Sequence, residues 1–272
     1  MTDNRPIGVF DSGMGGLTAM RQLVKLLPSE DLIYFGDTGR VPYGGKSSET
    51  IVNYSRQDVA FLKQFNLKAI LIACGTVSTT ALSVLRKENN IPIIGVVEPA
   101  VKAALMATRN KRIGIIGTKA TIRSGAYSKA ILTMDDSVSI ESKACPLFVP
   151  LVEEGRVELD DSVTELIVSE YLCGMKEKDI DTLVLGCTHY PLLQSCIRKY
   201  MGQDVRLIDT GLECSIALKQ LLEVKDMLAD SRKNGSQMYY ASDSADDFKS
   251  IASVFLGYDL EGRVERVDID KY

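Results

Sequence analysis

Short runs of apolar residues, rich in β-branched side chains, recur along the chain and alternate with stretches of helical periodicity. Nearly every run is followed by Gly, Ser, Thr or Asp, which is typical of buried strands that end in a turn. Between the runs, apolar positions such as Leu17, Met20 and Leu23 fall on one face of a helix. The runs that predict strands are Ile7–Phe10, Leu32–Phe35, Ala69–Ala73, Ile91–Val97, Ile113–Ile116, Leu183–Leu185 and Val205–Ile208.

This alternation predicts an α/β fold in which mostly parallel sheets are flanked by helices. Ligands of such folds bind at the carboxyl ends of the strands, so the residues just after the apolar runs are the first candidates for a site. The chain also contains two pairs of similar segments. IGVFDSGMGGLTA and IGIIGTKATIRSGAY both predict a strand, a turn of small residues and a helix, and LKAILIACGTVSTTAL is similar to IDTLVLGCTHYPLL.

The repetition predicts two similar lobes that face each other across a cleft. We place the first lobe at residues 1–97 together with 211–272, and the second at residues 98–210. Lobes of roughly 100 residues are a common domain size. Within each lobe, one repeated strand ends in Ala-Cys or Gly-Cys, and a Thr and a predicted helix follow. Cys74 and Cys187 therefore occupy equivalent positions, and facing lobes would bring two thiols to opposite walls of one cleft.

Composition and charge narrow the possible functions. The 272 residues are 45% hydrophobic, and 32 basic against 36 acidic side chains give a net charge of −4. Because these charges are spread along the chain, no concentrated positive field favours nucleic acid as a partner. The N-terminus lacks a basic leader with an apolar segment, and no apolar run is long enough for a bilayer, so we expect a soluble cytoplasmic protein without a membrane partner. Six cysteines in that setting are expected to be reduced thiols.

Two glycine-rich segments imitate phosphate-binding loops. GMGGLT at residues 13–18 has Thr18 where a dinucleotide fingerprint needs its third glycine, and GGKS at residues 44–47 lacks the first glycine of a P-loop, since Arg40 stands in its place. The single histidine, His189, allows no zinc-type ligand cluster and would need a matched serine to form a triad. We therefore expect neither a nucleotide nor a metal. A lone histidine is commonly structural, but its place just after Cys187 makes a functional role equally plausible.

Two opposed thiols are suited to inverting a stereocentre. One base must remove a proton from one face of the carbon while an acid delivers a proton to the other, and a thiol with a pKa of about 8.5 can be tuned to either form. Both cysteines precede predicted helices, whose N-termini stabilise a thiolate and offer N–H groups to a carboxylate. Hydroxyl groups at the same turns would complete a carboxylate site, although each is also a common helix N-cap: Ser12, Thr76, Thr118, Thr121 and Thr188. The other cysteines, which are Cys145, Cys173, Cys196 and Cys214, are interpreted as packing residues.

Five motifs, in order between residue 7 and about residue 211, resemble those of the glutamate racemases in the aspartate/glutamate racemase superfamily. They are FDSGMGGLT, YFGDTGRVPYG, ACGTVST, CPLFVPLVEEG and GCTHYPLL. The resemblance implies a two-lobed enzyme that needs no pyridoxal phosphate or other cofactor, with Cys74 acting on one enantiomer of glutamate and Cys187 on the other. It further implies a homodimer that supplies D-glutamate for peptidoglycan synthesis.

The same resemblance implies roles for further residues. Asp11 and His189 match residues that assist the two cysteines, and Glu153 matches an acidic helper on the His189 side. Gly75 stands where these enzymes commonly have Asn, and the missing amide would cost on the order of 1–3 kcal/mol of substrate binding unless the backbone or water replaced it. Asp37 matches a motif residue to which we assign no role. The positions expected to contact substrate are Ser12, Pro42, Tyr43, Gly44, Gly75, Thr76, Thr118, Thr121 and Thr188.

Other functions remain open at this point. The Gly75 difference leaves aspartate racemisation or a relaxed specificity as a second hypothesis, although GCTHYP is typical of glutamate racemases. A third hypothesis is a binding protein that keeps the fold without the chemistry. Both cysteines together with Asp11, Glu153 and His189 argue against it, because a scaffold needs none of them. A fourth is a cysteine hydrolase, which would use one nucleophile and form an acyl intermediate.

Overall fold

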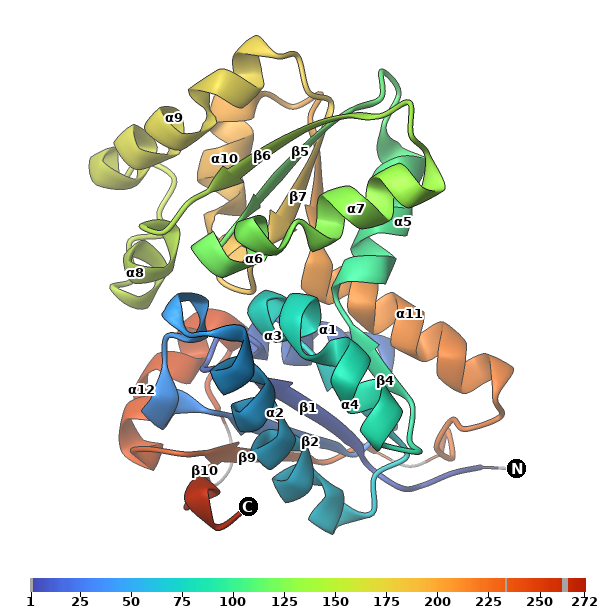
Figure 1. Ribbon diagram of the computed structural model, residues 1–272. Coiled ribbons are helices and arrows are strands. Elements are labelled where there is room, and N and C mark those ends of the chain that lie inside the picture. The colour runs from blue at the N-terminus through green and yellow to red at the C-terminus, as the bar shows by residue number, and fades with distance from the viewer. Residues whose placement is uncertain (1, 233, 261–263) are drawn as a thin grey trace.

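The computed structural model describes residues 2–232, 234–260 and 264–272, and it contains two β-sheets (Figure 1). The larger sheet is built from β1 (Ile7–Asp11), β2 (Leu32–Gly36), β3 (Ala69–Ile72), β4 (Ile93–Gly95), β9 (Gln237–Ala241) and β10 (Val264–Arg266). The smaller sheet is built from β5 (Arg112–Gly117), β6 (Ser139–Ala144), β7 (Thr182–Gly186) and β8 (Arg206–Asp209). All the pairings between these strands are parallel, so the predicted α/β class is confirmed.

The two sheets share a topology. The larger has the order β10-β9-β2-β1-β3-β4, and the smaller has the order β6-β5-β7-β8. Four consecutive strands of each sheet are thus arranged alike, with β1 equivalent to β5 and β3 equivalent to β7. The two similar lobes expected from the repeated segments are present, and Cys74 and Cys187 follow equivalent strands.

Helices cover both sheets. Their bounds are α1 (Leu17–Leu26), α2 (Ser48–Leu62), α3 (Gly75–Thr80), α4 (Leu82–Glu88), α5 (Val97–Ala107), α6 (Lys119–Ser124), α7 (Ala126–Met134), α8 (Phe148–Glu153), α9 (Ser162–Glu177), α10 (Gln194–Met201), α11 (Thr210–Val224) and α12 (Ala245–Leu256). The apolar stripe predicted from Leu17, Met20 and Leu23 is the buried face of α1. Within the described ranges, no helix has the length and hydrophobicity that crossing a bilayer requires.

Every apolar run named above overlaps a strand, and β6, β9 and β10 were not predicted. The run Ile91–Val97 extends beyond β4 at both ends, because Val97 already begins α5. Strand β6, with the sequence SIESKA, lies at the edge of its sheet and has only exposed or half-buried side chains. An edge strand of this kind buries too little apolar surface to show the hydrophobic pattern on which strand prediction depends.

Two helices join the lobes. The chain passes from β4 to β5 through α5 and leaves β8 through α11, which packs on both α1 and α5. On the side where the lobes face each other, α3 of the first lobe contacts α6 of the second (Figure 1). The division into domains at residues 1–97 with 211–272 and at residues 98–210 stays a prediction. The carboxyl ends of the central strands of both sheets are where the candidate site is built.

Candidate active site

Cys74 lies in the turn between β3 and α3 and is buried. Its Sγ is 3.2 Å from Oγ of Ser12, which follows β1. Burial, together with the nearby Asp11 carboxyl group, raises the pKa of the Cys74 thiol to about 12. The sequence predicted that the N-terminus of the following helix would stabilise a thiolate at Cys74, but the effect of burial is larger. Cys74 is therefore a protonated thiol at neutral pH.

Asp11 ends β1 and is buried behind the Ser12 turn. Its Oδ2 accepts a hydrogen bond of 3.0 Å from the backbone N–H of Gly13, while its Oδ1 is buried and has no hydrogen-bond partner among the described residues. Burial raises the pKa of Asp11, although the positive charge of His189 and the backbone hydrogen bond act in the opposite direction. A buried oxygen without a hydrogen bond destabilises the folded protein, so Oδ1 is well placed to accept a hydrogen bond from a ligand.

A chain of three side chains occupies the opposite wall. Cys187 follows β7, and its Sγ is 3.9 Å from Nδ1 of His189. On the other side of the ring, Nε2 is 3.0 Å from Oε1 of Glu153, the last residue of α8. Burial disfavours the charged imidazole, but the hydrogen bonds to Cys187 and Glu153 outweigh it and raise the pKa of His189 to about 10. His189 is therefore an imidazolium at neutral pH, with one N–H directed at each neighbour.

The helix predicted directly after Cys187 is a short 3-10 helix, η4 (Tyr190–Leu193), which runs into α10. Pro191 lies in its first turn, where a missing N–H is tolerated. The turn brings the Thr188 hydroxyl to 3.5 Å from Nδ1 of His189. On the first lobe, the Thr18 hydroxyl lies 3.1 Å from the carbonyl oxygen of Thr188, so the two lobes touch beside the Cys187 turn.

Both thiols line a single cavity of about 390 Å³. The cavity takes its walls from both lobes, since residues after β1, β3, β5 and β7 all contribute. All the predicted site residues line it except Thr121, which lies behind Thr118 and accepts a hydrogen bond of 3.0 Å from the Thr118 hydroxyl. The predicted residues that the structure brings together here are Asp11, Ser12, Pro42, Tyr43, Gly44, Cys74, Gly75, Thr76, Thr118, Glu153, Cys187, Thr188 and His189.

Sequence reasoning missed part of the cavity wall. Lys119, a surface cation beside Thr118, also lines the cavity, and its place directly after a predicted hydroxyl was an available signal. Apolar residues from the segment before Glu153 line the same wall, but they carry no chemical signature in a sequence. The missed residues are Gly13, Val41, Gly45, Lys119, Pro146, Val149, Pro150 and Gly186.

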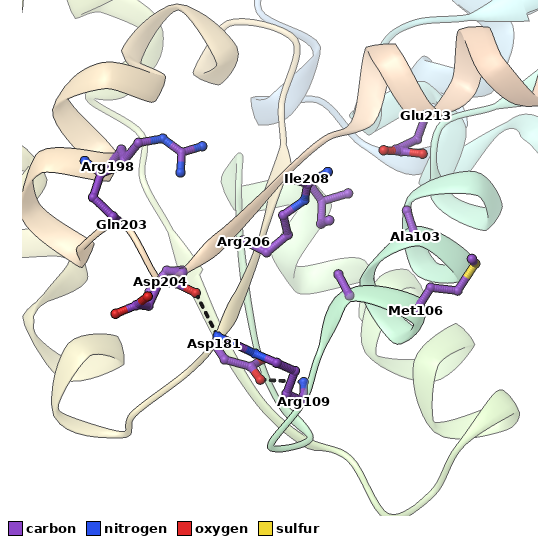
Figure 2. A pocket seen from close by; sticks show the side chains of 12 residues that line it. Ala103, Met106, Arg109, Asp181, Arg198, Gln203, Asp204, Arg206, Ile208 and Glu213 are labelled. Carbon is purple, nitrogen blue, oxygen red and sulfur yellow. Dashed lines mark hydrogen bonds between the residues drawn. The ribbon is translucent and has the colours of Figure 1, made fainter.

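A second cavity, of about 550 Å³, lies between α5, β8, α10 and α11 (Figure 2). Arg109, Arg198 and Arg206 lie around it together with Asp204 and Glu213, so positive and negative groups are mixed. None of the described residues that line it is a cysteine or a histidine. Across the described part of the chain, no group of three or more His, Cys, Asp or Glu side chains is placed to hold a metal ion. The cavity with both thiols is therefore the candidate active site.

Comparison with known proteins places this arrangement in a family. Residues 7–214 match the family model described as Asp/Glu/Hydantoin racemase. The chain belongs to this family. Within it, the chain is 44% identical to a glutamate racemase from Geobacter metallireducens over 266 residues, which are 98% of this chain and 97% of that protein.

Solved structures of other racemases are similar over nearly their whole length. A glutamate racemase isoform from Bacillus anthracis superposes with a TM-score of 0.92 at 40% identity, covering 98% of each chain. The glutamate racemase from Francisella tularensis, described as a complex with D-glutamate, superposes with a TM-score of 0.91 at 41% identity, covering 99% of this chain and 100% of that one. This racemase-family chain therefore shares the whole two-lobed architecture with those proteins.

In this racemase-family chain, a buried ionic network holds the loop that carries Pro42, Tyr43 and Gly44. The Tyr43 hydroxyl donates to the carboxylate of Asp37 and lies 3.3 Å from Oδ2 of Asp58. Arg40 pairs with both carboxylates, at 2.6 Å from Asp37 and 3.1 Å from Asp58. Burial and the neighbouring Asp37 raise the pKa of Asp58 well above its ordinary value.

The network gives a structural role to Asp37, to which the sequence alone assigned none. Asp37 anchors the loop by accepting hydrogen bonds from Tyr43, Arg40 and Ser242. Asp58 was not predicted, because it lies on α2, well after the motif in sequence, and an acidic residue in a helix has no distinguishing pattern. Both carboxylates act behind the cavity wall, through Tyr43.

Proposed function

We propose that this chain interconverts L- and D-glutamate without a cofactor, by proton transfer between the substrate α-carbon and the thiols of Cys74 and Cys187. The observation that carries the proposal is that two thiols, on equivalent turns of two similar lobes, line one cavity. Relatives named as glutamate racemases, at 40% identity and above over nearly the full length, support glutamate as the substrate.

The proton transfers balance as follows. One sulfur, as thiolate, takes the α-proton, so that a C–H bond breaks, an S–H bond forms and the electron pair of the C–H bond moves towards the substrate carboxylate. The opposite thiol then donates its proton to the other face of the carbon, and that sulfur becomes the thiolate. Solvent exchange resets the two sulfurs. Each cysteine therefore removes the α-proton of one enantiomer and, in the reverse direction, donates a proton when that same enantiomer is formed.

The two walls prepare their sulfurs differently. Cys74 is a thiol with a pKa of about 12, which suits it to donate a proton in the empty enzyme. The imidazolium of His189 can stabilise negative charge on the Cys187 sulfur, and the hydrogen bond to Glu153 adds to the one with Cys187 in raising the pKa of His189. One thiol and one potential thiolate across a cavity are what a single inversion requires.

Polar groups of the cavity suit the rest of the substrate. The unpartnered Oδ1 of Asp11 would accept a hydrogen bond from the substrate ammonium group. The hydroxyls of Thr76 and Thr118, 3.2 Å apart across the lobes, would bind the α-carboxylate, and Lys119 offers a cation to the second carboxylate. A dicarboxylic amino acid is therefore favoured over a neutral one.

Deuterium exchange tests the proposal. In D₂O, purified protein should label the α-carbon of both glutamate enantiomers while it interconverts them. Cys74→Ala and Cys187→Ala should each abolish racemisation, whereas Cys173→Ala, an exposed cysteine on α9, should retain it. Full racemase activity in either of the first two variants would refute the assignment. Parallel assays with aspartate test the aspartate racemase alternative, and a mass-spectrometric search for an acyl-enzyme tests the cysteine hydrolase alternative.

We further propose, from the family resemblance, that the enzyme is a cytoplasmic homodimer that supplies D-glutamate for peptidoglycan. Deletion of the gene in a bacterium without another source of D-glutamate should make growth depend on added D-glutamate. Sedimentation velocity measures the oligomeric state, and a monomer at all concentrations would contradict the dimer.

A further inference from the structure

The imidazole ring of His189 lies between the two lobes. His189 follows β7 of the second lobe, but two segments of the first lobe pack against its ring. In the turn before α1, a Cβ atom built on Gly15 would lie 2.5 Å from Nδ1 of His189, so bare backbone lies directly against the ring there. The ring of Phe255 stands nearly perpendicular to the imidazole, with an interplanar angle of 85° and 5.2 Å between the ring centroids. The first lobe therefore completes the surroundings of a residue of the second.

Phe255 is supplied by α12, a helix outside residues 7–214 that match the family model. The helix packs on α1, β9 and β10, so it belongs to the lobe of the larger sheet (Figure 1). Of its two buried phenylalanines, Phe248 contacts the ring of Tyr34 within that lobe, whereas Phe255 reaches His189 of the second lobe. Phe255 is completely buried and does not line the cavity. Its side chain therefore acts on His189 and not on a substrate.

The contacts that His189 makes within its own lobe leave the ring loosely held. Nδ1 is 3.9 Å from Sγ of Cys187 and 3.5 Å from the hydroxyl oxygen of Thr188, and both distances are long for hydrogen bonds. The 3.0 Å contact of Nε2 is with Glu153, whose side chain is 52% exposed. Rotation of the ring about this contact would turn Nδ1 away from Cys187. Edge-to-face packing against Phe255 restricts this rotation.

We infer that Phe255 is a positioning residue that keeps Nδ1 of the His189 imidazolium directed at Cys187. The inference rests on the proposed racemase function and assigns α12 a part in it. Without the aromatic ring, the imidazolium can turn away from the sulfur, and water can enter between them and weaken the attraction between the charges. Both changes destabilise the Cys187 thiolate that removes the α-proton. Substrate binding should change little, because Phe255 does not line the cavity.

The chain contains a single histidine, so the position of His189 can be measured directly. In NMR spectra of untagged, histidine-labelled protein, every imidazole signal comes from this residue. In Phe255→Leu, the carbon-bound ring protons should shift because the ring current of Phe255 is lost, and the Nδ1 signal should move because its N–H no longer faces Cys187. The kcat of racemisation should fall about 10- to 100-fold, since a misplacement of about 1 Å can reduce a rate 100-fold, while KM changes less than threefold.

Phe248→Leu is the matched control, because it removes the other buried ring of the same helix. It should leave the Nδ1 signal and kcat as in the wild type. A double-mutant cycle then separates positioning from stability. If Phe255 acts through His189, Phe255→Leu should reduce kcat no further in a His189→Gln background, and the same loss in both backgrounds would overturn the inference.

Other outcomes also decide against this role of Phe255. An unmoved Nδ1 signal in Phe255→Leu would overturn the inference, and so would an equal loss of kcat in Phe248→Leu. If Phe255→Leu does not melt cooperatively, Phe255→Met, which keeps the chain length without the ring, takes its place. Failure of both variants to fold would overturn the inference, because Phe255 would then serve stability. If the wild-type enzyme does not racemise glutamate, the proposed function fails, and the NMR comparison still decides whether Phe255 holds His189.

Discussion

Replacing Glu153 by Gln removes the negative charge that faces His189 but keeps an oxygen that can accept its Nε2–H. The two side chains are 3.0 Å apart, and the Glu153 side chain is 52% exposed, against 9% for His189. Unit charges about 4 Å apart interact with about 1 kcal/mol in water and about 4 kcal/mol at the effective dielectric near a protein surface. Because half of Glu153 faces water, we take about 1–2 kcal/mol, which lowers the pKa of His189 by about one unit.

The consequence should appear at alkaline pH. The pKa of His189 is about 10, so at pH 7 the imidazolium persists in the variant and activity should change little. Above its pKa, His189 loses the positive charge that stabilises negative charge on the Cys187 sulfur, and racemisation should decline. In Glu153→Gln this decline should begin about one pH unit lower than in the wild type.

Circular dichroism follows the interconversion of the enantiomers directly, so kcat/KM can be measured in both directions between pH 6 and pH 10.5. Glu154→Gln is the matched control, because it removes the same charge from the exposed neighbour of Glu153. The reasoning would be refuted if the alkaline decline stayed in place in Glu153→Gln. It would be refuted equally if both variants shifted the decline by the same amount.

Three further results are expected. The wild-type free energy of unfolding should fall, by a few kcal/mol at most, as the pH rises from about 6.5 to about 10. The reason is that the folded protein holds the His189 proton more tightly than the unfolded chain does. Urea titrations of His189→Gln should not show this fall. Tyr43→Phe removes a hydroxyl that donates a hydrogen bond to buried Asp37. Urea titration should therefore show a free energy of unfolding that is lower by about 1–3 kcal/mol, and steady-state kinetics should show a raised KM. Unchanged values would contradict the role of Tyr43 in anchoring the loop. Lys68→Met removes the cation that pairs with buried Glu30, which among the described residues keeps only its hydrogen bond from the backbone N–H of Ala229. The variant should cost about 3–5 kcal/mol in the same titration without moving the pH profile, whereas a loss below about 1 kcal/mol would argue against the pair.

Much of the fold could be predicted because local patterns report burial directly. The runs that became β1, β3, β5 and β7 are buried in the centre of their sheets, so nearly every side chain in them is apolar. The exposed edge strand β6 escaped prediction for the opposite reason. The cysteine turns were found from their repeated context, because equivalent positions in repeated units remain equivalent after folding.

Other features of the site could not be predicted, because they join segments that are far apart in the chain. Asp58 reaches the loop of Tyr43 from α2, and its raised pKa arises from burial beside Asp37. Thr121 was expected on the cavity wall with the other hydroxyls, but it lies behind Thr118, and only the packing of α6 decides which of the two faces the cavity.

The amino-acid sequence by itself determined the alternation of buried strands with helices, the two-fold repetition and the pair of cysteines at equivalent turns, because periodicity and turn chemistry act over a few neighbouring residues. Only the tertiary structure decided that Glu153, His189 and Cys187 form one chain of contacts, and that the ring of Phe255 packs against His189. Protonation states and the width of a cleft depend on desolvation and on distances between remote segments, and both are set by packing rather than by local sequence.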